Sequence, residues 1–164
     1  QAAIRWLAAN PPPPAQKISI VHGDYRLDNL MFHATQPKVL AVLDWELSTL
    51  GHPLADFSYH CMSWHIKPGS FRGIGGLDHQ ALGIPTEAEY IHRYCQRTGF
   101  TTPEKLAVDW SFYMAYNLFR MAAILQGIAK RVVDGTASSD QAKASGNGAK
   151  PMAELAWQFA SQVH

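Results

Sequence analysis

Short apolar runs separated by turn-forming residues dominate the first third of the 164-residue chain. Residues 18–21 form a β-branched run that leads directly to His22, which predicts a strand that feeds a loop. Residues 30–33 and 38–43 are two more apolar stretches, and a turn-prone tetrapeptide separates them. We therefore predict a β-hairpin, with Asp44 at its far end.

Helical periodicity governs the chain before and after this region. Residues 1–10 have the pattern of the end of a helix, and the proline run at 11–14 then predicts a stiff extended connector. Thr86 followed by Glu89 is a capping-box signature, and Gly99 ends the helix that it starts. Between Asp44 and this helix, the pattern predicts helical or irregular structure.

A long central helix and a terminal helix complete the pattern. Residues 135–150 are rich in Ser, Ala, Gly and Lys, which predicts a mobile loop or connector, and Pro151 then opens the terminal helix. The central helix starts at Thr102-Pro103, and its apolar residues recur at helical spacing: Trp110, Tyr113, Met114, Leu118, Met121, Ile124, Leu125 and Ile128. We expect an α+β fold that is mostly helical, with one small hairpin.

The overall composition excludes several classes of function. Lys and Arg total 14 and Asp and Glu total 13, so the net charge of +1 gives no broad field that would attract nucleic acid or a membrane surface. The two cysteines, Cys61 and Cys95, fit no disulfide framework and no zinc ribbon. No apolar run approaches the roughly 20 residues that span a bilayer. We therefore expect a cytoplasmic protein.

Three polar side chains bracket the predicted hairpin and carry the candidate chemistry. Asp24 and Asn29 belong to the loop that follows the first strand, and Asp44 comes after the hairpin. Phosphoryl transfer needs a carboxylate that orients the attacking hydroxyl, and hard oxygen ligands that hold magnesium against the nucleotide phosphates. The spacing is also close to that of a kinase catalytic loop, in which an asparagine follows the aspartate and a second aspartate comes later.

At these positions the sequence resembles the aminoglycoside phosphotransferase and choline kinase superfamily, and more closely the phosphotransferase-like domains associated with acyl-CoA dehydrogenases. The resemblance covers most of the chain. It rests on three motifs in this order, with a looser match at 119–127: His22-Gly23-Asp24-Tyr25-Arg26-Leu27-Asp28-Asn29-Leu30, Leu43-Asp44-Trp45-Glu46 and Gly51-His52-Pro53-Leu54-Ala55-Asp56. Many relatives have aspartate where this chain has His52, so we leave that position out of the site.

The resemblance implies a role for each matching residue. Asp24 would be the catalytic base, and Asn29 and Asp44 would bind Mg²⁺, with ATP as the co-substrate and a small-molecule hydroxyl as the acceptor. His22 would brace the loop, and the Asp56 carboxylate would accept hydrogen bonds from its backbone. Arg26, two residues after the base, is a candidate for stabilising charge on the transferred phosphate.

The resemblance also implies a protein-kinase-like fold of which residues 1–164 form only the C-terminal lobe. The family's N-terminal lobe grips ATP through a phosphate-covering loop and a lysine, and no such stretch precedes His22. We therefore expect little or no catalysis by this chain alone. A lobe without its neighbour would expose apolar surface, so we also expect a homodimer through that face.

Several positions allow a plain structural explanation beside the functional one. Arg26 could be a surface ion pair, Asp28 a turn former and Trp45 simple packing. Asn117 and Arg120 are polar positions in the long apolar helix, and they either face the substrate groove or lie on its solvated side. Four side chains could suggest a zinc site, although their spacing fits no familiar zinc pattern: His52, His60, Cys61 and His65.

Two alternative functions stay open at this stage. A kinase-like lobe can persist as a non-catalytic binding or assembly module, although retention of all three ligand-type residues argues against decay. A metal-dependent hydrolase could use the same carboxylates, but no second cluster of ligands is evident in the sequence.

Overall fold

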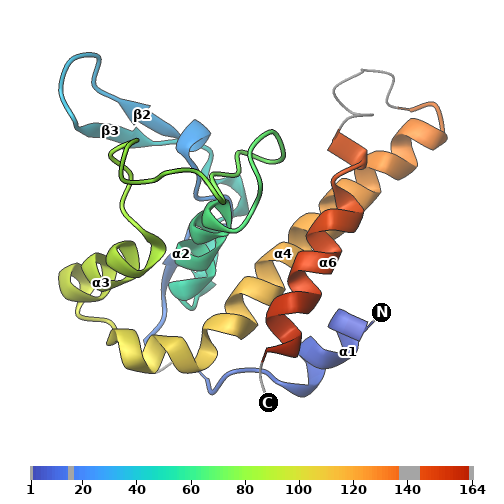
Figure 1. Ribbon diagram of the computed structural model, residues 1–164, viewed down its shortest axis with the longest axis horizontal. Helices are drawn as coiled ribbons and strands as arrows, with labels where there is room; N and C mark the ends of the chain where they lie inside the picture. The colour runs from blue at the N-terminus through green and yellow to red at the C-terminus, as the bar shows by residue number, and fades with distance from the viewer. Residues whose placement is uncertain (1, 15–16, 137–144, 163–164) are drawn as a thin grey trace.

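The computed structural model describes residues 2–14, 17–136 and 145–162, and within these it is an α+β fold in which helices dominate, as predicted (Figure 1). The elements follow one another in this order: α1 Ala2–Ala9, β1 Ser19–Val21, η1 Leu27–Asn29, β2 Leu30–Phe32, β3 Val39–Val42, η2 Trp45–Leu47, β4 Thr49–Gly51, α2 Leu54–Cys61, η3 Met62–Trp64, α3 Glu87–Thr98, α4 Pro103–Val133 and α6 Ala149–Ser161.

The predicted hairpin is confirmed, and a further strand appears that the sequence pattern did not reveal. β2 and β3 pair antiparallel, with an irregularity between Met31 and Phe32. β1 pairs antiparallel with β4, which lies in the segment that we expected to be helical or irregular. That expectation was wrong for β4 because a strand of three residues is too short to show alternation, and its partner lies far back in the sequence.

The helix ends form where the sequence placed them. The Thr86 side chain accepts a hydrogen bond from Glu89 N, the Glu89 carboxylate accepts one from Thr86 N, and Gly99 ends α3 with φ of 58°. Thr102 caps α4, with Pro103 in the first position, because an N–H there would have no partner within the helix. The capping signatures therefore predicted both starts correctly.

The predicted connector at 135–150 is wrong at its end. Residues 137–144 lie outside the described residues, but Ala149 and Lys150 already belong to α6. Pro151 is tolerated in this first turn because the amides there do not bond within the helix. Ala149, Met152 and Ala156 are buried, so packing against α4 extends the helix backward past the proline.

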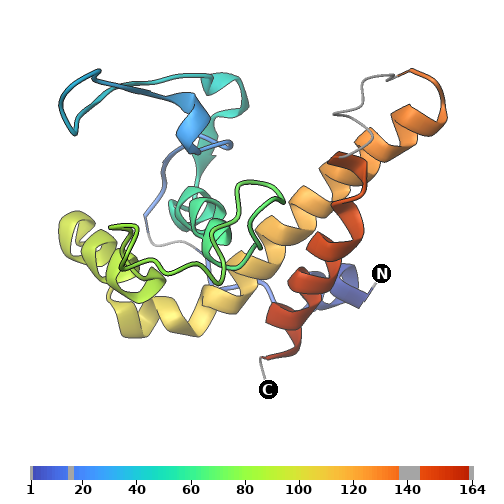
Figure 2. The ribbon, with the colours of Figure 1, turned by 45° about the horizontal axis from the view of Figure 1, so that its top comes forward.

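The core lies where three helices meet along α4. Figures 1 and 2 both show α6 running beside α4, with α1 near the C-terminal end of α6. α2 packs on α4 through the fully buried Asn117, whose Nδ2 donates to Ala55 O at 3.0 Å and to Ser58 Oγ at 2.8 Å. Ser58 Oγ donates onward to Leu54 O at 2.6 Å. Asn117 therefore faces α2 and not solvent, and it fixes the helix that follows β4.

The strands carry apolar side chains that the described residues leave uncovered. Ile20 and Leu50 are cross-strand partners and are 69% and 74% exposed. Ile18, two residues before Ile20 and so on the same face, is also 69% exposed. No helix in the part of the chain that the structure describes has the length and apolarity needed to cross a membrane.

Candidate phosphotransfer site

Asp56 holds the backbone of the loop that follows β1. Its Oδ2 accepts a hydrogen bond from His22 N at 2.5 Å, and its Oδ1 accepts one from Gly23 N at 2.9 Å. Gly23 has φ of 85°, and a Cβ there would lie 2.6 Å from Leu47 O, so both the conformation and the space require glycine. The loop thus turns sharply, with its amides directed into one carboxylate supplied by α2.

His22 ties the same loop to the end of the hairpin. The ring is buried, with 2% exposed, and its Nδ1 accepts a hydrogen bond from Asp24 N at 3.2 Å. Nε2 therefore carries the proton and donates to Leu43 O at 2.7 Å. With both nitrogens engaged in this way, the imidazole joins two backbone segments, as a bracing residue would.

The Asp24 carboxylate receives donors on both oxygens. Tyr59 Oη donates to Oδ1 at 2.8 Å, and Asn29 Nδ2 donates to Oδ2 at 3.0 Å and to the Asp24 backbone carbonyl at 2.9 Å. Arg26 Nε lies 3.1 Å from Oδ2 in an ion pair. The side chain is 18% exposed, so this held carboxylate still reaches the surface of the cleft.

Asp44 is exposed at the end of β3 and has a strained backbone. Its φ and ψ of 65° and 56° are left-handed, a conformation that aspartate tolerates better than most residues. The preceding residue is fixed twice, because Leu43 N donates to Asn29 O at 2.8 Å and Leu43 O accepts from His22. The hairpin therefore returns Asp44 to the rim of the loop that carries Asp24 and Asn29.

The donor set at this rim fits a hard cation held jointly with a nucleotide. Asn29 uses Nδ2 for its bonds to Asp24, so its amide oxygen could serve as a ligand, as could the exposed carboxylate of Asp44. Mg²⁺ is typically bound by one or two such protein oxygens together with substrate phosphates. Across the described residues, no group of three or more His, Cys, Asp or Glu gathers into a metal cluster, zinc clusters included.

Arg26 belongs to a network of ion pairs. Its Nε lies 3.8 Å from an oxygen of Asp28, which also pairs with Arg72 from the loop before α3. Asp28 is therefore more than a turn former, because it joins two guanidinium groups beside Asp24. Phe71 and Arg72 both have positive φ, of 32° and 55°, and such strain often accompanies functional sites.

Two residues of this site, Tyr59 and Arg72, were missed by the sequence interpretation, and a third, Arg120, was left undecided between the substrate groove and solvent. Arg120 donates to Gly23 O, and its guanidinium lies over the Tyr59 ring, 5.2 Å from the centroid. Burial, reinforced by the hydrogen bond to Asp24, raises the pKa of Tyr59 well above its usual value, so its hydroxyl stays a donor. Helical spacing offered a signal for two of them, because Tyr59 follows Asp56 by three positions and Arg120 follows Asn117 by three.

Two cavities meet beside Asp24. One, of about 530 Å³, is an open cleft whose lining includes Asp24 and Arg120. The other, of about 310 Å³, has a mostly apolar lining that includes several aromatic rings, and we call it the aromatic cavity. Four side chains line both cavities: Arg26, Tyr59, Phe71 and Arg72. The cleft that Asp24 lines therefore adjoins an apolar chamber.

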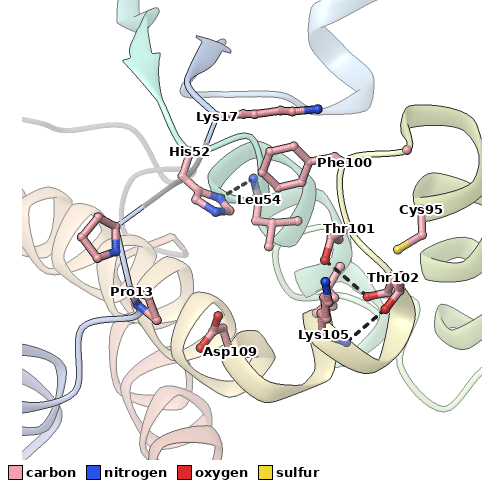
Figure 3. A pocket seen from close by; sticks show the side chains of 13 residues that line it. Pro13, Lys17, His52, Leu54, Cys95, Phe100, Thr101, Thr102, Lys105 and Asp109 are labelled. Carbon is pink, nitrogen blue, oxygen red and sulfur yellow. Dashed lines mark hydrogen bonds between the residues drawn. The ribbon is translucent and has the colours of Figure 1, made fainter.

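A separate cavity of about 550 Å³ lies around His52, and its lining does not include Asp24 (Figure 3). His52 Nδ1 accepts a hydrogen bond from Leu54 N at 3.2 Å, and the ring packs on Phe100 and Tyr113. Burial lowers the pKa of His52, while the charge of Asp109 opposes that shift. These contacts describe a packed histidine at the base of α2.

Comparison with known proteins identifies a family and several relatives. A model of the phosphotransferase enzyme family matches residues 1–108. Acyl-CoA dehydrogenase family member 10 of Mus musculus is 49% identical over 162 residues, which cover 97% of this chain and 15% of that protein. Acyl-CoA dehydrogenase family member 11 of Homo sapiens is 36% identical over 164 residues, which cover 99% of this chain and 20% of that protein.

A solved structure extends the match to the fold. It comes from Ralstonia eutropha JMP134, and its assignment as an aminoglycoside phosphotransferase is itself provisional. The two share 63% identity with a TM-score of 0.90, over 98% of this chain and 48% of that one. The chain thus spans about half of the solved protein and a fifth or less of the two dehydrogenase relatives. The resemblance drawn from the motifs, and the kinase-like α+β fold, are confirmed.

Proposed function

Because this chain belongs to the phosphotransferase enzyme family, we propose that it forms the catalytic lobe of a kinase that transfers the γ-phosphate of ATP to a small-molecule hydroxyl. The observation that carries the proposal is the Asp24 carboxylate, held by Tyr59 and Asn29 at the edge of an open cleft. A general base needs this position, with the acceptor oxygen within hydrogen-bond reach.

Each polar side chain at the rim has a task in this reaction. Asp24 orients the acceptor hydroxyl and takes its proton as the new O–P bond forms and the bond from the γ-phosphorus to ADP breaks. Asn29 and Asp44 would hold magnesium, which supplies neutralisation of the phosphate charge when bound. Arg26 adds a positive charge next to the base, where negative charge on the transferred group collects.

Nucleotide binding is the part of the proposal that reaches beyond this chain. The solved relative is about twice as long, and we propose that its additional half corresponds to the lobe that grips ATP in this family. The chain by itself would then release ADP slowly. Joined to that half, it would turn over with Mg-ATP and a suitable alcohol.

A chimera tests the proposal directly. The 164 residues replace their equivalent in the Ralstonia eutropha protein, and ADP release is measured with Mg-ATP and panels of uncharged alcohols and aminoglycosides. We expect Asp24→Asn to lower the alcohol-dependent rate by about 100-fold to 10,000-fold, the usual contribution of a general base. Asp134→Asn, at an exposed aspartate just past α4, is the matched control and should leave the rate unchanged.

Two results would count against this function. An Asp24→Asn chimera that keeps the full rate would remove Asp24 from the role of base. A chimera that binds Mg-ATP but releases no ADP with any acceptor would favour the alternative of a non-catalytic binding or assembly module. Separately, turnover by the isolated chain at the rate of the chimera would show that no second lobe is needed.

A further inference from the structure

The aromatic cavity beside the cleft has a wall with little freedom to move. Gly73 and Gly75 belong to the loop that forms this wall, and a Cβ at either would lie within 3.0 Å of Ile66 O, so the loop is pressed against that backbone. Ile74 N donates to Ser63 O at 2.8 Å, and Gly75 N donates to Ile66 O at 2.9 Å. The wall is therefore formed before any ligand arrives.

The cavity presents uncharged surfaces to a ligand. Trp64 and Tyr90 stack with centroids 5.1 Å apart, and the indole Nε1 already donates to Pro85 O at 3.0 Å. Burial lowers the pKa of His60 and raises the pKa of Tyr90 to about 12, so both rings are neutral near pH 7. Ile74 and Ile84 are among the aliphatic side chains of the lining.

The charged groups of this cavity lie at its junction with the cleft and are all cationic. Arg26 and Arg72 are among the four side chains that line both spaces, and both pair with Asp28. Among the described residues that line the aromatic cavity, none is Asp or Glu. Their carboxylate partners, Asp24 and Asp28, lie outside this lining. An ammonium group inside the chamber would therefore have no carboxylate of the described lining to pair with, which is unfavourable in a partly desolvated site.

From this lining we infer that the aromatic cavity is the acceptor site and takes an alcohol with an uncharged apolar body, and that it excludes polycationic aminoglycosides. The inference rests on the proposed function, because it places the acceptor hydroxyl at Asp24. The body of the acceptor occupies the chamber, and the hydroxyl passes Tyr59 and Arg26 to reach the base. Since a water molecule takes up about 30 Å³ of the liquid, a chamber of about 310 Å³ has room for a ligand body of roughly ten water-sized groups.

Binding of two named probes to the 164-residue chain tests the inference without requiring catalysis. Isothermal titration calorimetry compares 4-phenylbutan-1-ol, an uncharged aryl alcohol, with kanamycin. We expect saturable binding of the alcohol and none of kanamycin. Ile84→Asp places a carboxylate in the apolar lining and should weaken alcohol binding at least tenfold. Val108→Asp adds the same charge at a position that is 76% exposed on α4, and it should leave binding unchanged.

A second variant guards against a folding failure of the first. Ser63→Leu fills part of the chamber without adding charge, and it should also weaken the alcohol at least tenfold while circular dichroism stays the same. Binding of kanamycin but not of the alcohol, or alcohol binding that neither variant changes, would overturn the inference.

The chimera separates failure of this inference from failure of the proposed function. Alcohol binding that Ile84→Asp abolishes, with no alcohol-dependent ADP release, would leave the cavity assignment standing and remove the kinase reaction. ADP release that depends on kanamycin and not on the alcohol would keep the kinase and overturn the acceptor class.

Discussion

Asp24 shows how much support a single carboxylate receives from distant parts of the chain. Asn29 is its local partner, whereas Tyr59 comes from α2 and Arg120 reaches from α4 to the neighbouring Gly23 carbonyl. These donors fix the carboxylate plane before a substrate binds. Positioning of this kind contributes to catalysis because the reacting groups then need no further ordering.

Tyr59→Phe tests this positioning at the residue scale. The substitution keeps the ring under Arg120 and removes only the hydroxyl that donates to Asp24. A hydrogen bond to a charged group contributes about 1.5 to 3 kcal/mol, so we expect kcat in the chimera to fall by about tenfold or more. The KM for ATP should be unchanged, because Tyr59 contacts Asp24 and not Asp44.

Tyr116→Phe provides the matched control for that measurement, since Tyr116 is 43% exposed on α4. A fall in kcat of the same size in both variants would show a general effect of losing a tyrosine hydroxyl. For Tyr59→Phe, a tenfold rise in the KM for the alcohol with no change in kcat would place Tyr59 in substrate binding instead.

At the scale of elements, α2 and α4 act as one support for the loop. α2 supplies Asp56 and Tyr59 to the site, and α4 supplies Arg120. The buried Asn117 joins the two helices through the Ala55 carbonyl and the Ser58 hydroxyl. This interhelical contact therefore sets the distance between residues that act together on Asp24.

We expect Asn117→Ala to lower the free energy of unfolding by about 2 kcal/mol or more, because it leaves buried polar groups of α2 without a donor. Urea denaturation followed by circular dichroism measures the change. Gln158→Ala, at an exposed position of α6, should change stability by no more than about 0.5 kcal/mol. Equal values for the two variants would mean that the Asn117 contacts add nothing to stability.

Sequence reasoning succeeded at this scale where the signal was local. Each helix start is determined by a capping residue, Thr86 or Thr102, that is adjacent to it in the sequence. The hairpin before Asp44 likewise pairs segments that are only a few residues apart. It failed for β4, whose pairing with β1 is decided by a contact between distant segments. The same limit hid Tyr59 and left the environment of Arg120 undecided, because their contacts with the loop span 35 and 97 positions of sequence.

For the molecule as a whole, the β1–β4 pair presents an exposed apolar face. Ile18, Ile20 and Leu50 lie on one face, and each is more than two-thirds exposed. Apolar patches of this kind tend to associate in water. A second copy of the 164-residue chain would cover this face at high concentration, whereas in a longer protein another part of the same chain would cover it.

Light scattering after size exclusion tests the expected homodimer of the 164-residue chain. We expect a species of twice the 18.2 kDa chain mass at high concentration, because pairing removes the apolar face from water. The double variant Ile20→Lys, Leu50→Lys should give a monomer. Val133→Lys, which is 83% exposed at the end of α4, should leave the dimer intact.

A monomer at every concentration for the unaltered chain would contradict this expectation. If the additional half of the relative covers this face instead, Ile20→Lys with Leu50→Lys should reduce turnover in the chimera. Light scattering and turnover together therefore show whether a second copy or the additional half covers the face.

The short β1–β4 ladder has a mechanical consequence. β1 runs straight into the loop of Asp24, and β4 runs by way of one tight turn into the helix of Asp56. The three residue pairs of this ladder therefore connect the segment before Asp24 with the segment before Asp56. We therefore expect a partner that covers Ile20 and Leu50 to restrain the orientation of the Asp24 carboxylate as well.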